Sequence, residues 1–198
     1  MRSILGPVDT SFFPQLPRGQ PMSSQITQQA LPTGTWSVDR IHSTVGFAVK
    51  YLAGTFRGTF SDFDARLDDG VLTGSAEVAS VQVKDPNLET HLQRPEFFDA
   101  ERFPRLSFKA DDVGRSGDDL TISGELTLKG HTEPVEIKGH ISDPAPDPYG
   151  GERFGLQLEA TVDRTKFGLN WNNPLRSGDP ALANDVTILA DLQLAREA

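Results

Sequence analysis

The chain has 198 residues, of which 36% are hydrophobic, and a formal net charge of −9. A chain of this length can bury a sizeable core as one domain without crosslinks, and the absence of cysteine excludes disulfides, thiolate chemistry and thiol-ligated metals. Binding to phosphate backbones or anionic headgroups depends on clustered cations, which this acidic sequence lacks. We therefore expect no nucleic-acid partner.

The N-terminal segment, residues 1–32, is rich in Pro, Gln and Ser and has the period of neither a strand nor a helix. A segment without an apolar face cannot offset the entropy that it loses on ordering. We expect a disordered arm over residues 1–32 and one domain over residues 33–198. Prolines interrupt the apolar run of roughly 7–15 residues that a secretory signal needs, and no run reaches the roughly 20 residues of a membrane span. The sequence thus predicts a cytoplasmic protein without a transmembrane segment.

From Gly34 onward, apolar residues alternate with polar ones, and turns that contain Gly, Pro or Asp separate the alternating segments. In the first segment Val45, Phe47 and Val49 share one face, and the residues between them share the other. Similar segments span residues 56–67, 72–83, 106–113, 120–128, 135–141, 154–162 and 186–194. About eight short strands at these spacings are typical of an antiparallel sandwich or barrel.

Two longer segments break the two-residue period. Residues 85–100 begin with a capping candidate, Asp85 or Asn87, and place Leu88 and Leu92 one helical turn apart, which predicts a short helix. Residues 163–185 form a long polar insertion that also carries large apolar side chains. Loops of this length are usually lids, binding loops or disordered. We expect the two segments to cover the open end of the domain together.

Five motifs follow one another over residues 34–197. They are W-S-V-D-x-x-H-S-x-V-x-F at 36–47, G-T-F-x-x-F at 58–63, H-L-Q-R-P-E-F-F-D-A-x-x-F-P-x-L-S-F at 91–108, G-E-L-T-L-K-G at 124–130 and R-T-K-F-G at 164–168. In this order they resemble the YceI-like family of bacterial lipocalin-type proteins. The resemblance implies an all-β fold, a lipocalin-like eight-stranded antiparallel β-barrel with a short helix closing one end. It also implies an elongated apolar pocket for polyisoprenoids, quinone-like or fatty lipids.

The interior of an eight-stranded barrel is just wide enough to be filled by side chains or to hold one small ligand. Ten of the twelve phenylalanines lie in the expected domain, and Gly54 and Gly58 let a strand bend and leave space beside them. In a filled interior these rings are ordinary core, and Phe97, Phe98 or Trp171 can anchor the helix or the rim instead. If the interior is hollow, we expect ligand contacts from Phe47, Phe56, Phe60, Phe63, Leu88, Leu92, Phe97, Phe98, Phe108, Leu169 and Trp171.

Three polar residues are candidates for contact with a ligand headgroup. Arg57 and Arg164 carry planar guanidinium groups that match phosphate or carboxylate, and His42 can donate a hydrogen bond; salt bridges to the abundant acids are the alternative for both arginines. Because His42 and Ser43 are strand neighbours on opposite faces, they cannot form a base–nucleophile pair. The histidines lack metal-ligand spacing, the Asp pairs adjoin turns, and no nucleotide-binding or nucleophile-elbow motif occurs. We expect no catalytic residue, metal or cofactor other than a bound lipid.

The resulting hypothesis is non-catalytic binding, storage or transport of a polyisoprenoid, an isoprenoid quinone or a fatty-acid-like lipid. The family resemblance also links such a protein to stress responses. Two alternatives remain at this point: an enzyme that acts on an apolar substrate in the same pocket, and a structural or interaction domain with a filled core. The sequence leaves open the identity of the ligand and whether the chain is a monomer or a homodimer.

Overall fold

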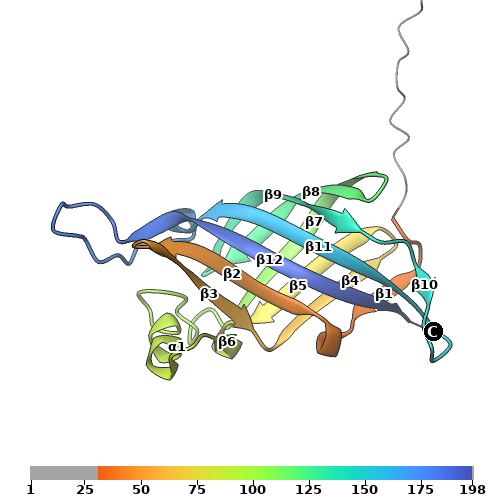
Figure 1. Ribbon diagram of the computed structural model, residues 1–198, viewed down its shortest axis with the longest axis horizontal. Helices are drawn as coiled ribbons and strands as arrows, with labels where there is room; N and C mark the ends of the chain where they lie inside the picture. Colours follow the sequence, from red (N-terminus) through yellow and green to blue (C-terminus); the bar gives the residue numbers. More distant parts are fainter. Residues whose placement is uncertain (1–30, 198) are drawn as a thin grey trace, which may run out of the picture.

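The computed structural model of the protein describes residues 31–197. Antiparallel strands curve into a closed barrel, and one short α-helix lies beside one end of it (Figure 1). The predicted all-β, eight-stranded antiparallel barrel with a short helix is confirmed. In chain order the elements are β1 (Thr35–Val38), η1 (Arg40–His42), β2 (Thr44–Tyr51), β3 (Gly54–Phe60), β4 (Phe63–Asp68), β5 (Val71–Glu77), η2 (Val78–Ser80), β6 (Val81–Gln82), α1 (Pro86–Leu92), β7 (Arg105–Ser116), β8 (Asp119–Leu128), β9 (His131–Ile141), β10 (Ala145–Pro146), β11 (Glu152–Asp163), η3 (Arg164–Phe167) and β12 (Leu182–Arg196).

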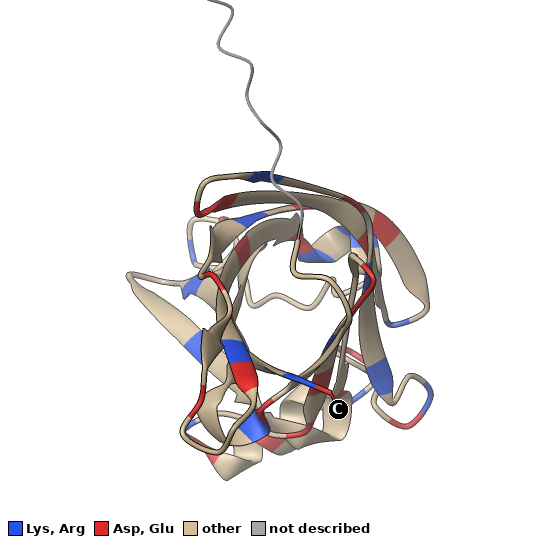
Figure 2. Cartoon of the chain, turned by 90° about the vertical axis from the view of Figure 1, so that its right-hand side faces the viewer, with Lys and Arg blue, Asp and Glu red and all other residues tan. Residues whose placement is uncertain are grey.

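Three members of the barrel are bent strands, each divided into two elements. β1 and β2 flank η1, β3 and β4 flank a bend at Ser61 and Asp62, and β5 and β6 flank η2. Around the ring these are followed by β7, β8, β9, β11 and β12, and the pairing of β12 with β1 and β2 closes the barrel. Figure 2 looks along the barrel and shows the strands as a ring. The predicted segments 56–67 and 72–83 therefore each correspond to one bent strand.

The last strand, β12, ties the ends of the barrel together. Along one edge it pairs with β11 from Asp163↔Asp185 to Arg153↔Ala195. Along the other edge its first part pairs with β2 and its last part with β1. Because β12 runs past the break at η1, it holds the two halves of the first bent strand in one continuous wall.

Side chains fill the half of the barrel near β1, which we call the closed end. The Trp36 ring lies edge-on to Phe154, with 4.9 Å between ring centroids, and the Arg196 guanidinium covers it at 5.4 Å. This arrangement buries one of the two tryptophans of the chain at an end where the strands alone would leave an opening. The most deeply buried large side chains here are Trp36, Leu67, Ile122, Ile141, Phe154 and Leu194.

A polar network covers the same end from outside. Asp39 caps η1 by accepting a hydrogen bond from the backbone nitrogen of Ile41, and it also contacts His42 Nδ1 at 3.0 Å. Arg153 bonds to Asp39 and, at 2.9 Å, to Asp147. Hydrogen bonds from His42 and Arg153 hold the pKa of Asp39 well below its usual range. The closed end is therefore sealed by charge-assisted bonds as well as by packing.

Helix α1 and the turns after it lie at the opposite end of the barrel, which we call the mouth (left in Figure 1). Asp85 caps the helix by accepting a hydrogen bond from the nitrogen of Asn87 at 2.8 Å, as one of the two predicted caps. Glu89 accepts a bond from the nitrogen of Val83 at 3.0 Å, which fixes the helix to the strand before it. Leu92 is buried at the last turn. Within residues 31–197, no helix is long and apolar enough to cross a bilayer.

The predicted arm, residues 1–32, lies almost wholly outside the described residues. Its last part does not: Leu31 packs against the core of the barrel. The Trp36 indole also donates a hydrogen bond to the carbonyl oxygen of Thr33 at 3.1 Å. Contacts with the domain thus begin at least two residues before the predicted boundary at residue 33.

Candidate ligand cavity

The half of the barrel near the mouth is hollow. It encloses a cavity of about 590 Å³, within the range of roughly 300–1,000 Å³ that is usual for small-molecule sites. Strands β2 to β5, β7 to β9, β11 and β12 form its wall, and α1 and residues 97–98 cover it. Asp64 and Glu159 border the wall, but their side chains are exposed. The interior surface is therefore almost entirely apolar, which contradicts the alternative of a filled core.

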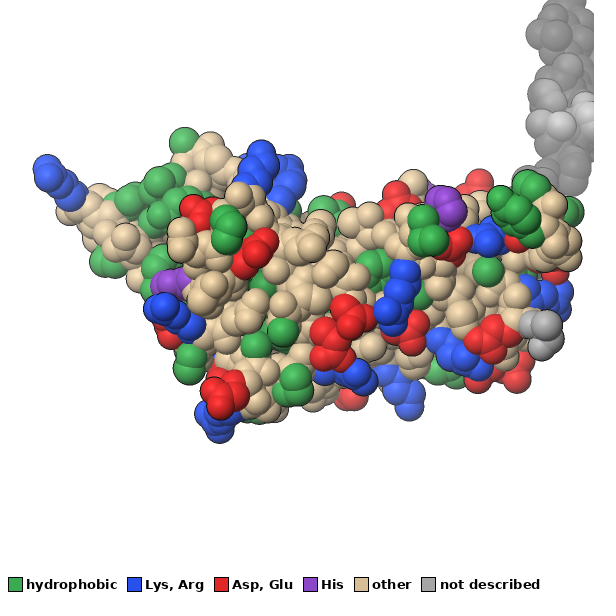
Figure 3. Space-filling model, turned by 90° about the horizontal axis from the view of Figure 1, so that it is seen from below, with side chains coloured by type: hydrophobic (Ala, Val, Ile, Leu, Met, Phe, Trp, Pro, Cys, Tyr) green, Lys and Arg blue, Asp and Glu red, His purple; other side chains and the backbone are tan. Residues whose placement is uncertain are grey.

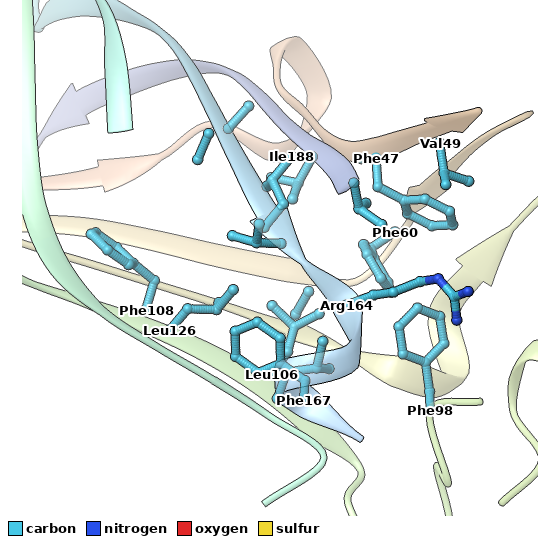
Figure 4. Close-up of a pocket in the computed structure, with 18 of the residues that line it drawn as sticks. Phe47, Val49, Phe60, Phe98, Leu106, Phe108, Leu126, Arg164, Phe167 and Ile188 are labelled. Atoms are coloured by element: carbon cyan, nitrogen blue, oxygen red, sulfur yellow. The ribbon is translucent and has the colours of Figure 1, made fainter. Parts of the chain in front are cut away.

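Four phenylalanines form a cluster at the mouth end of the cavity. The Phe47 ring lies 6.1 Å from Phe56 and 6.0 Å from Phe60, and Phe98 lies 6.2 Å from both Phe47 and Phe60. Gly58 makes this packing possible, because a Cβ atom there would lie 2.6 Å from Phe47 Cζ. Figure 4 shows Phe47, Phe60 and Phe98 together at one end of the cavity, with Phe108 at the other end.

The two segments predicted to cover the open end meet over the mouth. The His91 ring of α1 lies 5.6 Å from Trp171 of the loop before β12, and Phe97 lies 5.0 Å from Trp171. Lys129, in the turn between β8 and β9, donates to the carbonyl oxygens of Pro95 and Gly168, at 2.7 and 3.3 Å. An aromatic contact and a shared lysine therefore join the two covering segments.

Arg164 is the buried charged group at the cavity wall, and its side chain is 5% exposed. Local sequence explains its position: Asp163 caps η3, and Gly168, at φ 72°, ends it and turns the chain back. Figure 4 shows the Arg164 side chain at the same end of the cavity as Phe60 and Phe98. Burial lowers the pKa of this guanidinium from its usual value, and the nearby Asp163 charge opposes the shift.

The hydrogen bonds of Arg164 all go to neutral oxygen atoms, which belong to the loop that it begins and to the first residues of β12. The nitrogen Nε donates to the Ala183 carbonyl at 2.9 Å, and Nη1 donates to the Trp171 carbonyl at 2.9 Å and to that of Leu169. Nη2 is 3.5 Å from the Leu182 carbonyl and from Asn184 Oδ1. A guanidinium has five N–H donors, and these acceptors match them in number. Arg164 therefore ties the loop to the start of β12, and its donors face these acceptors instead of the interior of the cavity.

Ten of the eleven apolar side chains predicted to contact a ligand line this cavity. Phe63 does not: it points into the barrel, but it lies just past the bend at Ser61 and is packed in the core. The ten at the wall are Phe47, Phe56, Phe60, Leu88, Leu92, Phe97, Phe98, Phe108, Leu169 and Trp171.

Two of the three headgroup candidates lie away from the cavity, so those expectations are corrected. His42 belongs to η1 at the closed end, where its side chain is largely exposed and bonds to Asp39. Arg57 points outward, because it alternates with Phe56 and with the inward Gly58 on β3. Arg164 is at the cavity, in the role described above.

Sequence reasoning missed much of the deeper wall. The residues of this wall alternate along the predicted strands in step with the predicted inward residues, so the alternation could have identified them as inward-facing. His91 was also missed: it lines the cavity, and its buried Nε2 has no hydrogen-bond partner among the described residues, with Glu96 Oε1 at 3.9 Å. The missed apolar wall residues include Val45, Leu72, Leu106, Leu126, Ile137, Leu158, Val162, Ile188 and Leu192.

A closed antiparallel barrel with an apolar cavity is the architecture of lipocalin-like ligand-binding proteins, and this chain has it. The YceI-like domain model matches residues 36–194, and the chain therefore belongs to the YceI-like family. It is 31% identical over 136 residues to Protein YceI of Salmonella newport strain SL254, which covers 65% of this chain and 71% of the relative.

Solved structures show the same fold. Burkholderia cenocepacia BcnA has a TM-score of 0.68 at 21% identity, with 79% of this chain and 98% of that chain covered. The Campylobacter jejuni YceI protein has a TM-score of 0.63 at 20% identity, covering 71% and 85%. A domain from Saccharophagus degradans, described as polyisoprenoid-binding, has a TM-score of 0.62 at 12% identity and covers 82% and 98%.

Proposed function

We propose that this protein binds one long apolar ligand inside the barrel, without covalent chemistry. The observation that carries the proposal is the cavity of about 590 Å³ with an almost wholly apolar wall. The chemical classes that fit it are a polyisoprenoid, the chain of an isoprenoid quinone and a fatty-acid-like lipid. The polyisoprenoid-binding description of the Saccharophagus degradans domain, which shares the fold, supports the first of these.

Exclusion of water supplies the binding energy in this proposal. Apolar surface removed from water contributes about 25 cal/mol per Å², which has to exceed the several kcal/mol lost when a flexible ligand is immobilised. The wall consists mainly of Phe, Leu, Val and Ile side chains at inward positions on all eight strands of the barrel, which would contact a long apolar chain. Storage or transport follows from reversible binding of this kind, and a contribution to stress response remains part of the proposal.

The polar end of the ligand belongs at the mouth. The Arg164 donors face carbonyl and amide oxygens of the protein, whereas His91 Nε2 is buried beside the cavity and has no hydrogen-bond partner within residues 31–197. A hydroxyl, carbonyl or carboxyl group on the ligand would satisfy that nitrogen, because a buried polar atom without a partner is unfavourable. The aromatic rings of Phe97 and Trp171 flank His91 and would hold the first carbons of the chain.

Direct binding of prenyl and fatty probes tests the proposal. Ala160 lines the cavity and is buried, whereas its neighbour Thr161 is exposed on the outer face. We expect Ala160→Phe to occupy part of the cavity and weaken probe binding roughly tenfold or more, and Thr161→Phe to have little effect. Native mass spectrometry and organic extraction of protein from its natural host should also recover a lipid. Equal binding by the two variants, or failure of the parent protein to bind any probe, would refute the proposal.

A further inference from the structure

Apolar side chains are exposed at the mouth, next to the opening of the cavity. We call Tyr51, Leu52 and Leu175 the mouth rim; they are 38%, 59% and 42% exposed. Tyr51 also lines the cavity, so the rim continues the apolar wall to the outer surface. In Figure 3, apolar side chains gather at the end of the molecule from which residues 172–181 project (left).

Hydrogen bonds hold the two turns of the rim in place. The nitrogen of Leu52, in the turn between β2 and β3, donates to the Ala181 carbonyl at 2.9 Å. Leu175 lies at the tip of the projecting loop, where its nitrogen donates to Asp179 at 2.8 Å and its carbonyl accepts from Gly178 at 2.9 Å. These leucines are therefore presented to the surroundings by ordered turns.

Exposure alone does not select this surface. Ile41 and Tyr149, at the closed end, are 88% and 89% exposed. Within residues 31–197, Tyr51 is the one exposed large apolar side chain that also lines the cavity. The rim therefore differs from the other exposed apolar side chains because it is continuous with the cavity wall. The closed-end pair thus provides a natural control.

We propose that the mouth rim inserts into the surface of a zwitterionic lipid bilayer, from which the cavity takes up its ligand. This inference rests on the proposed function. Each methylene group of a long-chain ligand lowers the equilibrium constant for transfer from bilayer to water by roughly a factor of four. A path from bilayer to cavity that avoids water is therefore strongly favoured. Three side chains on turns offer an apolar area far below the roughly 800 Å² per partner that stable protein interfaces bury. Insertion into the apolar interior of a bilayer does not need such an area of matched surface.

Charge favours a zwitterionic over an anionic surface. Lys50 and Arg176 flank the rim and are exposed, so their long side chains can reach lipid phosphates while the leucines insert. The molecule as a whole carries −9, and Figure 2 shows acidic residues distributed over the barrel. An anionic bilayer would therefore repel the rest of the protein.

The test compares two double variants of the full chain with the parent protein. Leu52→Asn/Leu175→Ser removes the apolar rim, and asparagine suits the left-handed backbone of Leu52, which has φ 53°. Ile41→Ser/Tyr149→Ser removes two side chains at the closed end that are even more exposed than those of the rim. In co-sedimentation with phosphatidylcholine vesicles, we expect the rim variant to bind roughly tenfold more weakly and the control to bind like the parent.

Ligand transfer separates docking from cavity binding. We expect the rim variant to take up a fluorescent fatty or prenyl probe slowly from vesicles but at the parental rate from a cyclodextrin complex. Equal vesicle binding by rim variant, control and parent overturns the docking proposal, as does a several-fold increase in binding when phosphatidylglycerol is added. A dimer that is lost in the rim variant, without vesicle binding, assigns the rim to a second copy instead. Absence of uptake from cyclodextrin refutes the proposed function, while the vesicle result still decides docking.

Discussion

Gly58 is the position at which one added methyl group should reshape the cavity. In Gly58→Ala, the Cβ atom would lie 2.6 Å from Phe47 Cζ, 2.7 Å from Phe47 Cε1 and 3.0 Å from Val83 Cγ1. Because these are side-chain atoms, the Phe47 ring can move away from the added Cβ atom, and the space into which it can move is the cavity. Overpacking of this kind costs about 1–3 kcal/mol. At ~2–4 °C per kcal/mol for a domain of this size, the melting temperature should fall by several degrees.

The same variant should bind an apolar probe more weakly, because the displaced ring takes part of the ligand's volume. Gly54→Ala is the matched control on the same strand: the nearest atom to its Cβ is the Tyr51 carbonyl oxygen at 3.8 Å, an ordinary contact. That control should be neutral or stabilised by up to about 1 kcal/mol, because alanine loses less conformational entropy than glycine on folding.

A second substitution identifies the cause. Adding Phe47→Leu to Gly58→Ala should recover both stability and probe binding relative to the sum of the single changes, since the smaller side chain relieves the contact. Thermal unfolding and probe titration of the double-mutant cycle measure this coupling, which should be ~1–3 kcal/mol. Coupling below about 0.5 kcal/mol, the level of independent sites, would show that the Phe47 ring does not transmit the effect.

Three further predictions concern other parts of the molecule. Phe98→Ala should speed release of an apolar probe, measured by stopped-flow displacement, whereas Phe63→Ala should lower the free energy of unfolding by ~3–5 kcal/mol with little change in release. Phe108→Leu, at the deep end of the cavity, should shift the preferred probe toward longer chains in a series of graded lengths; an unchanged preference would contradict its position there. The Arg153 hydrogen bond lowers the pKa of Asp147, so the pair stabilises the protein above the unfolded carboxyl pKa of about 3.9 and less as the pH falls below it. Urea unfolding of Arg153→Met should therefore show a weaker loss of stability on acidification than the parent.

Strand positions could be predicted because alternation records which face each side chain occupies. In β8, Leu120, Ile122, Gly124 and Leu126 are buried, and the alternate residues Thr121, Ser123 and Glu125 are exposed, as the pattern indicates. The breaks at η1 and at Ser61 could not be predicted, because they arise from closure of the barrel and local preference does not mark them. The alternation of side chains is set by the sequence of each strand, whereas the bends are set by the curvature of the whole barrel.

The candidate site shows the same limit. Phe60 and Phe63 both point inward, but only Phe60 reaches the cavity, since depth along the barrel axis is not encoded by alternation. Arg164 was expected to meet a headgroup or an acid, and its acceptors are instead backbone carbonyls and one Asn amide, which have no sequence signature. The ligand's identity, the cytoplasmic location, a role in stress response and a homodimeric state stay predictions.

The pairing of β12 also governs when the cavity comes into existence. Residues 44–51 of β2 and 36–38 of β1 have no barrel neighbour on one edge until residues 182–196 arrive to join them. Contacts of such large sequence separation form slowly and expose unpaired edges meanwhile. During synthesis, therefore, the cavity cannot enclose a ligand before β12 has emerged from the ribosome and joined β1 and β2, and loading has to follow that step.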